Sequence, residues 1–263
     1  MNEQESMNFV TQYLAACFRP SSYRDLIEDK KHSLAAYVLV LCLFLLFIEN
    51  ILPFLAWDAS VGGMRNLILN VLPEFRIENG VMTCDTPLFL SVGDACTVKV
   101  DTSVDAYARD DLSEEYTAFY FSKTNMVAKN ASMNRVIPYT DLGSVVIDNK
   151  YLVNMLPVFY LSMVITTGLL YLATLGQYLF MTLFYALLCR GLLRDPGGDR
   201  LPFMTTFAIT IYARTLPSLI TVVGTVLGLP VHSILGEVLM VFLTMLYIFR
   251  GQASVLKMDF KKR

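Results

Sequence analysis

The chain has 263 residues, of which 55% are hydrophobic and only 17% carry a charge. Soluble domains average about 45–50% apolar and about 25% charged residues, so this composition argues against an ordinary soluble globular protein. The formal net charge of −2 offers no basic face, which excludes nucleic acid as a partner.

The first 32 residues are polar and of mixed charge, and they lack the apolar stretch of a cleavable signal peptide. Within them, residues 8–18 predict a helix with its apolar side chains near one face. These side chains are Phe9, Val10, Tyr13, Leu14, Cys17 and Phe18. A helix lying on the inner leaflet and a helix packed under a helical bundle fit this pattern equally well.

Four apolar stretches are long enough to cross the roughly 30 Å hydrocarbon core of a bilayer. They cover residues 33–57, 151–189, 201–229 and 230–250. The second stretch is ambiguous, because a helix of its length would measure about 58 Å. That is too long for one crossing and barely enough for two with a turn.

Positive charges favour a single crossing for residues 151–189. Basic residues precede the first stretch and follow the second and the last, and all three clusters share one face only if the second stretch crosses once. We therefore predict one long helix, in which Gly168 and Gly176 serve as bends or as close-packing positions. Gly228-Leu-Pro230 predicts a tight turn before the last crossing.

Residues 58–150 form the only large polar segment, with thirteen acidic and eight basic residues and a net charge of −5. Asn79-Gly80 between two apolar runs is a strong hairpin signal. We expect a short helix within residues 59–72 and a turn or two of helix within 122–134. The predicted strands are Glu74–Glu78, Val81–Cys84, Pro87–Val92, Cys96–Asp101, Thr117–Phe121 and Val145–Ile147.

The predicted fold class is a membrane α-helical bundle of four transmembrane helices with an inserted extracytoplasmic, mostly antiparallel β domain. The positive-inside rule places the protein in the cell membrane with both termini in the cytoplasm. The segments are the cytoplasmic amphipathic stretch 1–32, transmembrane helix 1 at 33–57, the outer β domain at 58–150, helix 2 at 151–189, a cytoplasmic loop at 190–200, helix 3 at 201–229, helix 4 at 230–250 and a basic cytoplasmic tail at 251–263.

Three ionisable residues fall inside the predicted crossings: Glu49, Arg214 and Glu237. Charges in hydrocarbon are costly, so they normally face the bundle interior and are paired. Arg214 lies about two turns deeper than both carboxylates. An arginine side chain is long enough to span this difference, so we expect it to contact Glu49 or Glu237. The three residues then line a path or a polar substrate site, or form a buried pair that fixes helix register. Because there are only three such residues, we favour the buried pair that fixes helix register.

Cys84 and Cys96 are the two cysteines of the polar segment, and they lie on neighbouring predicted strands. A disulfide between them and two separate buried thiols are equally consistent with this placement. The sequence contains no zinc-ligand spacing, no Ser/His/Asp set and no phosphate loop, and its only histidines are His32 and His232. We therefore expect no catalytic residue, no metal site and no cofactor.

Several stretches, in this order, resemble one bacterial family of membrane proteins of unknown function, which is common in Gram-positive bacteria. The family includes proteins assigned to maltodextrin utilisation and is loosely related to the Yip1-like membrane proteins. The resemblance implies a four-helix membrane protein with an outer β domain and no catalytic site. It is carried by Phe18-Arg-Pro20 with Tyr23 and Leu26, by Leu72-Pro-Glu-Phe-Arg-Ile-Glu-Asn-Gly80, by Val100-Asp-Thr102, by Phe119-Tyr-Phe-Ser-Lys123 and by Tyr212-Ala-Arg-Thr-Leu-Pro217.

The leading functional hypothesis is a non-enzymatic adaptor, or an assembly or regulatory partner, in the bacterial cell envelope. Its outer domain would then bind a protein partner, while the bilayer surrounds its helices. The alternative is a small transporter or transporter accessory subunit, linked to oligosaccharide uptake. Four crossings are few for a transporter, so that alternative requires a homo-oligomer.

Overall fold

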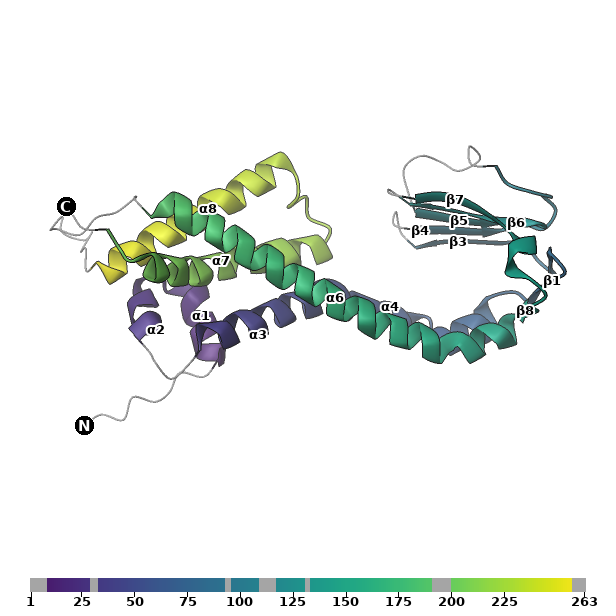
Figure 1. Cartoon of the computed structure of the whole chain (residues 1–263), viewed down its shortest axis with the longest axis horizontal. Coiled ribbons are helices and arrows are strands. Elements are labelled where there is room, and N and C mark those ends of the chain that lie inside the picture. The colour runs from purple at the N-terminus through teal and green to yellow at the C-terminus, as the bar shows by residue number, and fades with distance from the viewer. Residues whose placement is uncertain are drawn as a thin grey trace. The chain divides into compact units, whose positions relative to one another are not determined.

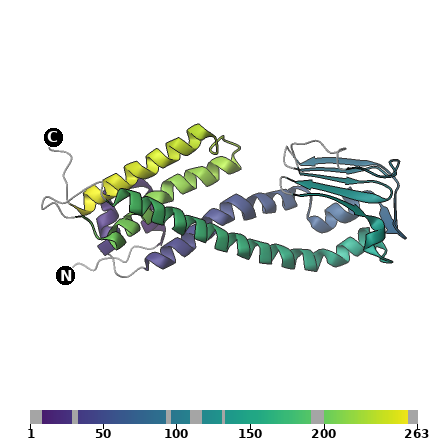
Figure 2. The same cartoon turned by 45° about the horizontal axis from the view of Figure 1, so that its top comes forward.

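The computed structural model describes residues 9–28, 33–92, 96–108, 117–130, 133–190 and 200–256. The chain divides into two compact units (Figures 1 and 2). The helical unit comprises residues 1–55 and 165–263, and the β unit comprises residues 56–164. The predicted loop 190–200 and tail 251–263 lie largely outside the described residues.

Four helical stretches in the described part of the chain are long and apolar enough to cross a membrane. They are Leu34–Ser60, Asn149–Cys189, Phe203–Val226 and Ile234–Val255. The first consists of α3 (Leu34–Leu46), a π-helical turn η2 (Phe47–Ile51) and α4 (Leu52–Ser60); the others are α6, α7 and α8. The ambiguous stretch is therefore one continuous helix, α6, of 41 residues, as predicted.

Helix α7 is the most enclosed of these helices, and it pairs with α8 through a tight turn (Figure 1). Its buried threonines include Thr206, Thr210 and Thr215, each of which donates to the carbonyl four residues earlier. This local bonding satisfies their hydroxyls inside an apolar core. Gly228 has a φ of 70° in the predicted turn between the two helices.

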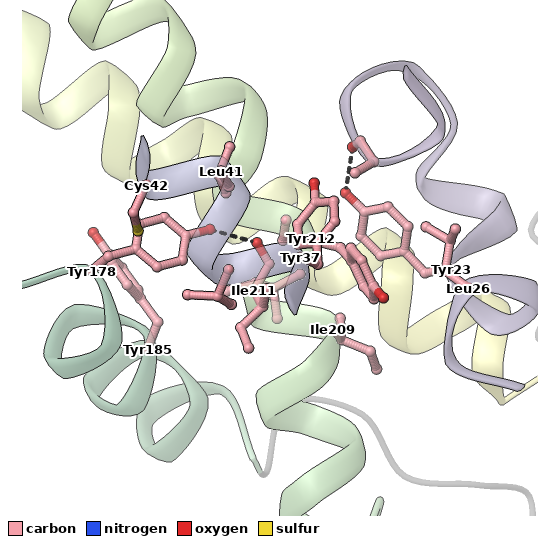
Figure 3. Packing of buried hydrophobic residues seen from close by; sticks show 14 of the residues in the cluster. Tyr23, Leu26, Tyr37, Leu41, Cys42, Tyr178, Tyr185, Ile209, Ile211 and Tyr212 are labelled. Carbon is pink, nitrogen blue, oxygen red and sulfur yellow. Dashed lines mark hydrogen bonds between the residues drawn. The ribbon is translucent and has the colours of Figure 1, made fainter. Parts of the chain in front are cut away.

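The amphipathic N-terminal segment forms α1 (Phe9–Phe18), η1 (Pro20–Ser22) and α2 (Tyr23–Glu28). The Tyr23 hydroxyl donates to the Ala16 carbonyl at 2.8 Å (Figure 3), and the Tyr247 hydroxyl of α8 donates to the Cys17 carbonyl at 2.7 Å. One face of α1 thus packs against the other helices, as one of the two predicted alternatives required. The opposite face exposes an apolar stripe of Val10, Leu14 and Phe18.

The β unit contains a three-stranded sheet of order β2-β1-β8 and a five-stranded sheet of order β3-β4-β5-β6-β7. All pairs are antiparallel except β4 with β5. The φ angles of Asn79 and Gly80 are 52° and 79°, as a type I′ hairpin requires. The strands are β1 Phe75–Glu78, β2 Val81–Cys84, β3 Leu88–Val92, β4 Cys96–Val100, β5 Thr117–Phe121, β6 Asn125–Asn130, β7 Met133–Pro138 and β8 Ile147–Asp148.

The helical turn expected within residues 122–134 is wrong, because β6 and β7 occupy this region. Buried Asn125 fixes the start of β6. Its side-chain nitrogen Nδ2 donates to the Tyr107 backbone carbonyl at 2.9 Å, and its side-chain oxygen Oδ1 accepts from the Tyr107 backbone amide at 3.0 Å. Partners distant in sequence therefore override a weak local helix preference. The short helix expected within residues 59–72 is present as α5 (Met64–Asn66) and η3 (Leu67–Val71).

Cys84 has a free thiol, whose sulfur lies 3.1 Å from the Thr86 carbonyl oxygen. Its strand, β2, belongs to the three-stranded sheet, whereas the strand of Cys96, β4, belongs to the other sheet. The Cys96 side chain lies outside the described residues. The disulfide between Cys84 and Cys96 therefore stays a prediction.

Candidate functional site

Arg214 lies on α7, one turn before Pro217. Proline has no amide proton, so it interrupts the helical bonding beside the arginine. The Arg214 Nη1 donates to the Tyr178 carbonyl and, at 2.8 Å, to Thr182 Oγ1, both on α6. Its Cζ lies 4.4 Å from the Tyr178 ring centroid and 5.9 Å from that of Tyr185. Two acceptors and two aromatic faces therefore surround this cation.

Tyr178 completes a reciprocal connection between α6 and α7. Its hydroxyl donates to the Ile211 carbonyl of α7 at 2.7 Å (Figure 3), while its own carbonyl accepts from Arg214. Tyr178 is 4% exposed, so both bonds lie in the interior of the helical unit. The two helices thus each present a side chain to the other's main chain, which fixes the position of the guanidinium.

Glu49 lies in the π-helical turn η2. The backbone amide of Leu52 donates to the carbonyl of Phe47, five residues earlier, and Pro53 follows directly in the sequence. Pro53 cannot donate to Glu49, so the extra residue of a π turn accommodates the missing bond. Glu49 is exposed at this turn. Such bulges occur frequently at functional sites.

Glu237 lies in the first turn of α8. Ser233 caps this helix, and its Oγ accepts from the Gly236 amide at 3.2 Å. A carboxylate in the first turn is favourable, because the helix dipole is positive at that end. Glu237 is also exposed.

All three predicted residues, Glu49, Arg214 and Glu237, line one cleft of about 480 Å³ in the helical unit. Sequence reasoning missed the neutral polar residues beside them. On α6 and α7 these residues recur three or four positions apart, as residues on one helical face do, and this spacing was a usable signal. They are Thr174, Gln177, Ser218, Thr221 and Thr244, and His232 also lines the cleft.

The predicted contact of Arg214 with Glu49 or Glu237 is wrong. Within the described ranges, no ion pair joins Arg214 to either carboxylate. The reason is that α6 supplies a carbonyl, a hydroxyl and two rings at contact distance, so the guanidinium is stabilised without a carboxylate. The two carboxylates and the arginine share the cleft but are held apart.

No group of three or more His, Cys, Asp or Glu side chains is arranged to hold a metal ion among the residues the structure describes. The lining of the cleft provides hydrogen-bond donors, acceptors and separated charges. This arrangement suits binding a polar molecule by its charges and hydrogen bonds.

The fold and the cleft define a class: a mostly helical protein with four stretches of membrane-crossing length and apolarity, together with two β-sheets. The family model described as "Protein of unknown function (DUF1189)" matches residues 10–251. The chain belongs to this family. No curated protein and no solved structure shows a significant match to the chain.

Proposed function

We propose that this protein is a multi-pass membrane protein that binds a small zwitterionic solute in the cleft of its helical unit without converting it. The observation that supports this proposal is that Arg214, Glu49 and Glu237 line one cleft, and that no ion pair among the described residues joins Arg214 to either carboxylate. Separated charges at membrane depth are costly. A solute with one negative and one positive group satisfies both kinds of charge at once.

The chemistry of the lining matches such a solute. A guanidinium donates to carboxylate or phosphate oxygens in a planar fork, and both bonds of Arg214 to described residues use Nη1 alone. Glu49 and Glu237 accept from an ammonium group. The volume of about 480 Å³ falls within the roughly 300–1,000 Å³ of small-molecule sites.

The cellular role we propose is that of a binding or regulatory component in the bacterial cell envelope, without enzymatic activity. Both termini face the cytoplasm and the β unit lies outside, which places the basic clusters on the inner side. In this role the chain acts with a protein partner or with a second copy of itself. The resemblance to the maltodextrin-linked, Yip1-like proteins makes maltose the neutral solute to compare.

Binding to the purified full-length protein in lipid nanodiscs tests the proposal. The probes are ω-amino acids from glycine to 6-aminohexanoate, the matching carboxylates and alkylammonium ions, and maltose. One ω-amino acid should bind about tenfold tighter than either half-molecule, a difference of about 1.4 kcal/mol. Maltose binding in preference to every charged probe contradicts the zwitterion and supports the oligosaccharide link.

Charge-removing variants make the test specific. Glu237→Gln should lower affinity for the ω-amino acid and for alkylammonium, while it leaves carboxylate binding unchanged. Arg214→Gln should lower affinity for the ω-amino acid and for the carboxylates, while it leaves alkylammonium binding unchanged. Arg24→Gln is the matched control, because Arg24 is a partly exposed arginine of the same unit, lies outside the cleft and pairs with Glu28 at 2.8 Å. Equal effects of all three variants on all probes overturn the proposed site.

A further inference from the structure

A second cavity, separate from the cleft, lies within the β unit. It has a volume of about 350 Å³, and apolar side chains from both sheets line it. Side chains alternate between the two faces of a strand. Accordingly, Ile77 of β1 and Met82 of β2 line the cavity from one sheet, while Val98 of β4 and Ile137 of β7 line it from the other.

This cavity is larger than a packing defect. Protein interiors contain few voids larger than a water molecule, and an engineered apolar cavity of about 150 Å³ already binds benzene. Only Ile77, Met82, Val100 and Tyr139 of its lining are buried, and the other lining residues are partly exposed. The two sheets thus present converging apolar side chains without filling the space between them.

An apolar track connects the cavity with a helix of membrane-crossing character. Leu152, in the first turn of α6, lines the cavity. Met155 and Phe159 lie three and seven positions further along the same helical face, and each is 39% exposed. These three side chains extend an apolar surface along α6 from the lining of the cavity.

A polar cleft also borders the cavity. Phe75 lines both the apolar cavity and a cleft of about 360 Å³ that contains charges of both signs. Arg76 and Lys150 supply the positive charges, and Asp148 is among the negative ones. An apolar cavity beside a charged cleft matches the two parts of an amphiphile.

We propose that the β unit binds one acyl chain of a bilayer phospholipid in this cavity, with the headgroup in the neighbouring charged cleft. The occupant is a membrane lipid because the track of Leu152, Met155 and Phe159 belongs to a helix long and apolar enough to cross a membrane. The proposal is independent of the zwitterion site in the helical unit.

The experiment uses the full-length protein in nanodiscs that contain phosphatidylcholine with a diazirine at the end of one acyl chain. After illumination, mass spectrometry of peptides locates the adducts. We expect adducts on peptides that contain Met82, Phe121 or Met126, in addition to those of the membrane-crossing helices. Adducts confined to the helices, with none between residues 72 and 147, overturn the proposal.

Variants that fill the cavity identify the site. Val98→Phe should reduce the adducts within the β unit about tenfold, equivalent to about 1.4 kcal/mol of binding free energy. Val81→Phe is the matched control, because Val81 lies outside the lining and is 37% exposed. If Val98→Phe fails to fold, Ile137→Phe fills the cavity from another strand. Unchanged β-unit labelling in a folded filling variant also overturns the proposal.

Discussion

The guanidinium of Arg214 lies over the ring of Tyr178, with its Cζ 4.4 Å from the ring centroid, and donates to the carbonyl of the same tyrosine. One residue thus provides both a π-face and a backbone acceptor. Such contacts stabilise a cation without neutralising it, so Arg214 keeps its charge available in the cleft. This relationship explains why the arginine needs no carboxylate partner in the helical unit.

Two replacements of Tyr178 should separate the hydrogen bond of its hydroxyl from the cation–π contact of its ring. Tyr178→Phe removes the hydrogen bond to Ile211 and should lower the free energy of unfolding by about 1 kcal/mol. Tyr178→Leu also removes the cation–π contact and should cost about 1–2 kcal/mol more. Chemical unfolding in mild detergent measures both, with Tyr160→Phe, at an exposed tyrosine of α6, as the control. Equal stability of the Phe and Leu variants would contradict a cation–π contribution.

Gly251 should tolerate no larger residue. A Cβ at this position would lie 2.5 Å from Tyr23 Cδ2 and 2.7 Å from Ile209 Cγ2, and both of these side chains are fully buried. Gly251→Ala should therefore destabilise the helical unit by about 1–3 kcal/mol. Gly168→Ala is the matched control, since nothing lies within 4 Å of its added Cβ. Thermal unfolding followed by circular dichroism should show a lower midpoint for Gly251→Ala alone.

Stability should fall at alkaline pH because of Cys17. Burial raises the pKa of its thiol to about 11, whereas an unfolded thiol ionises near pH 8.5. The fold therefore prefers the neutral thiol. Its contribution is complete below about pH 8.5 and is lost as the pH rises toward about 11. Unfolding midpoints between pH 8 and 9.5 should decline less for Cys17→Ala than for the unmodified chain. Identical slopes would rule out this linkage.

The topology proposed above, in which α6 crosses the membrane once, predicts that the two ends of the chain face the cytoplasm. Green fluorescent protein fused after residue 263 should fluoresce in cells, and alkaline phosphatase fused after residue 148 should be active. Both follow from an odd number of crossings between the β unit and the cytoplasmic loop. A dark C-terminal fusion would contradict this topology.

The sequence predicted elements whose signals are local. The four apolar helices and the Asn79-Gly80 hairpin follow from composition, length and turn chemistry. The β6–β7 hairpin escaped prediction because Asn125 is positioned by Tyr107, eighteen residues away. The partner of Arg214 also escaped, because only the packed structure brings the Tyr178 carbonyl and the Thr182 hydroxyl to α7. Charge pairing is a poor guide where neutral acceptors lie closer.

Through the π turn at Phe47–Ile51, Pro53 influences where Glu49 lies in the cleft. With an alanine there, an ordinary α-helical register becomes available, and one residue fewer per turn rotates the chain by about 100°. The Glu49 side chain would then point in a different direction around the helix axis, relative to the residues that follow it. The electrostatic character of the cleft therefore depends on an uncharged residue outside its lining, and a search restricted to charged positions would overlook that dependence.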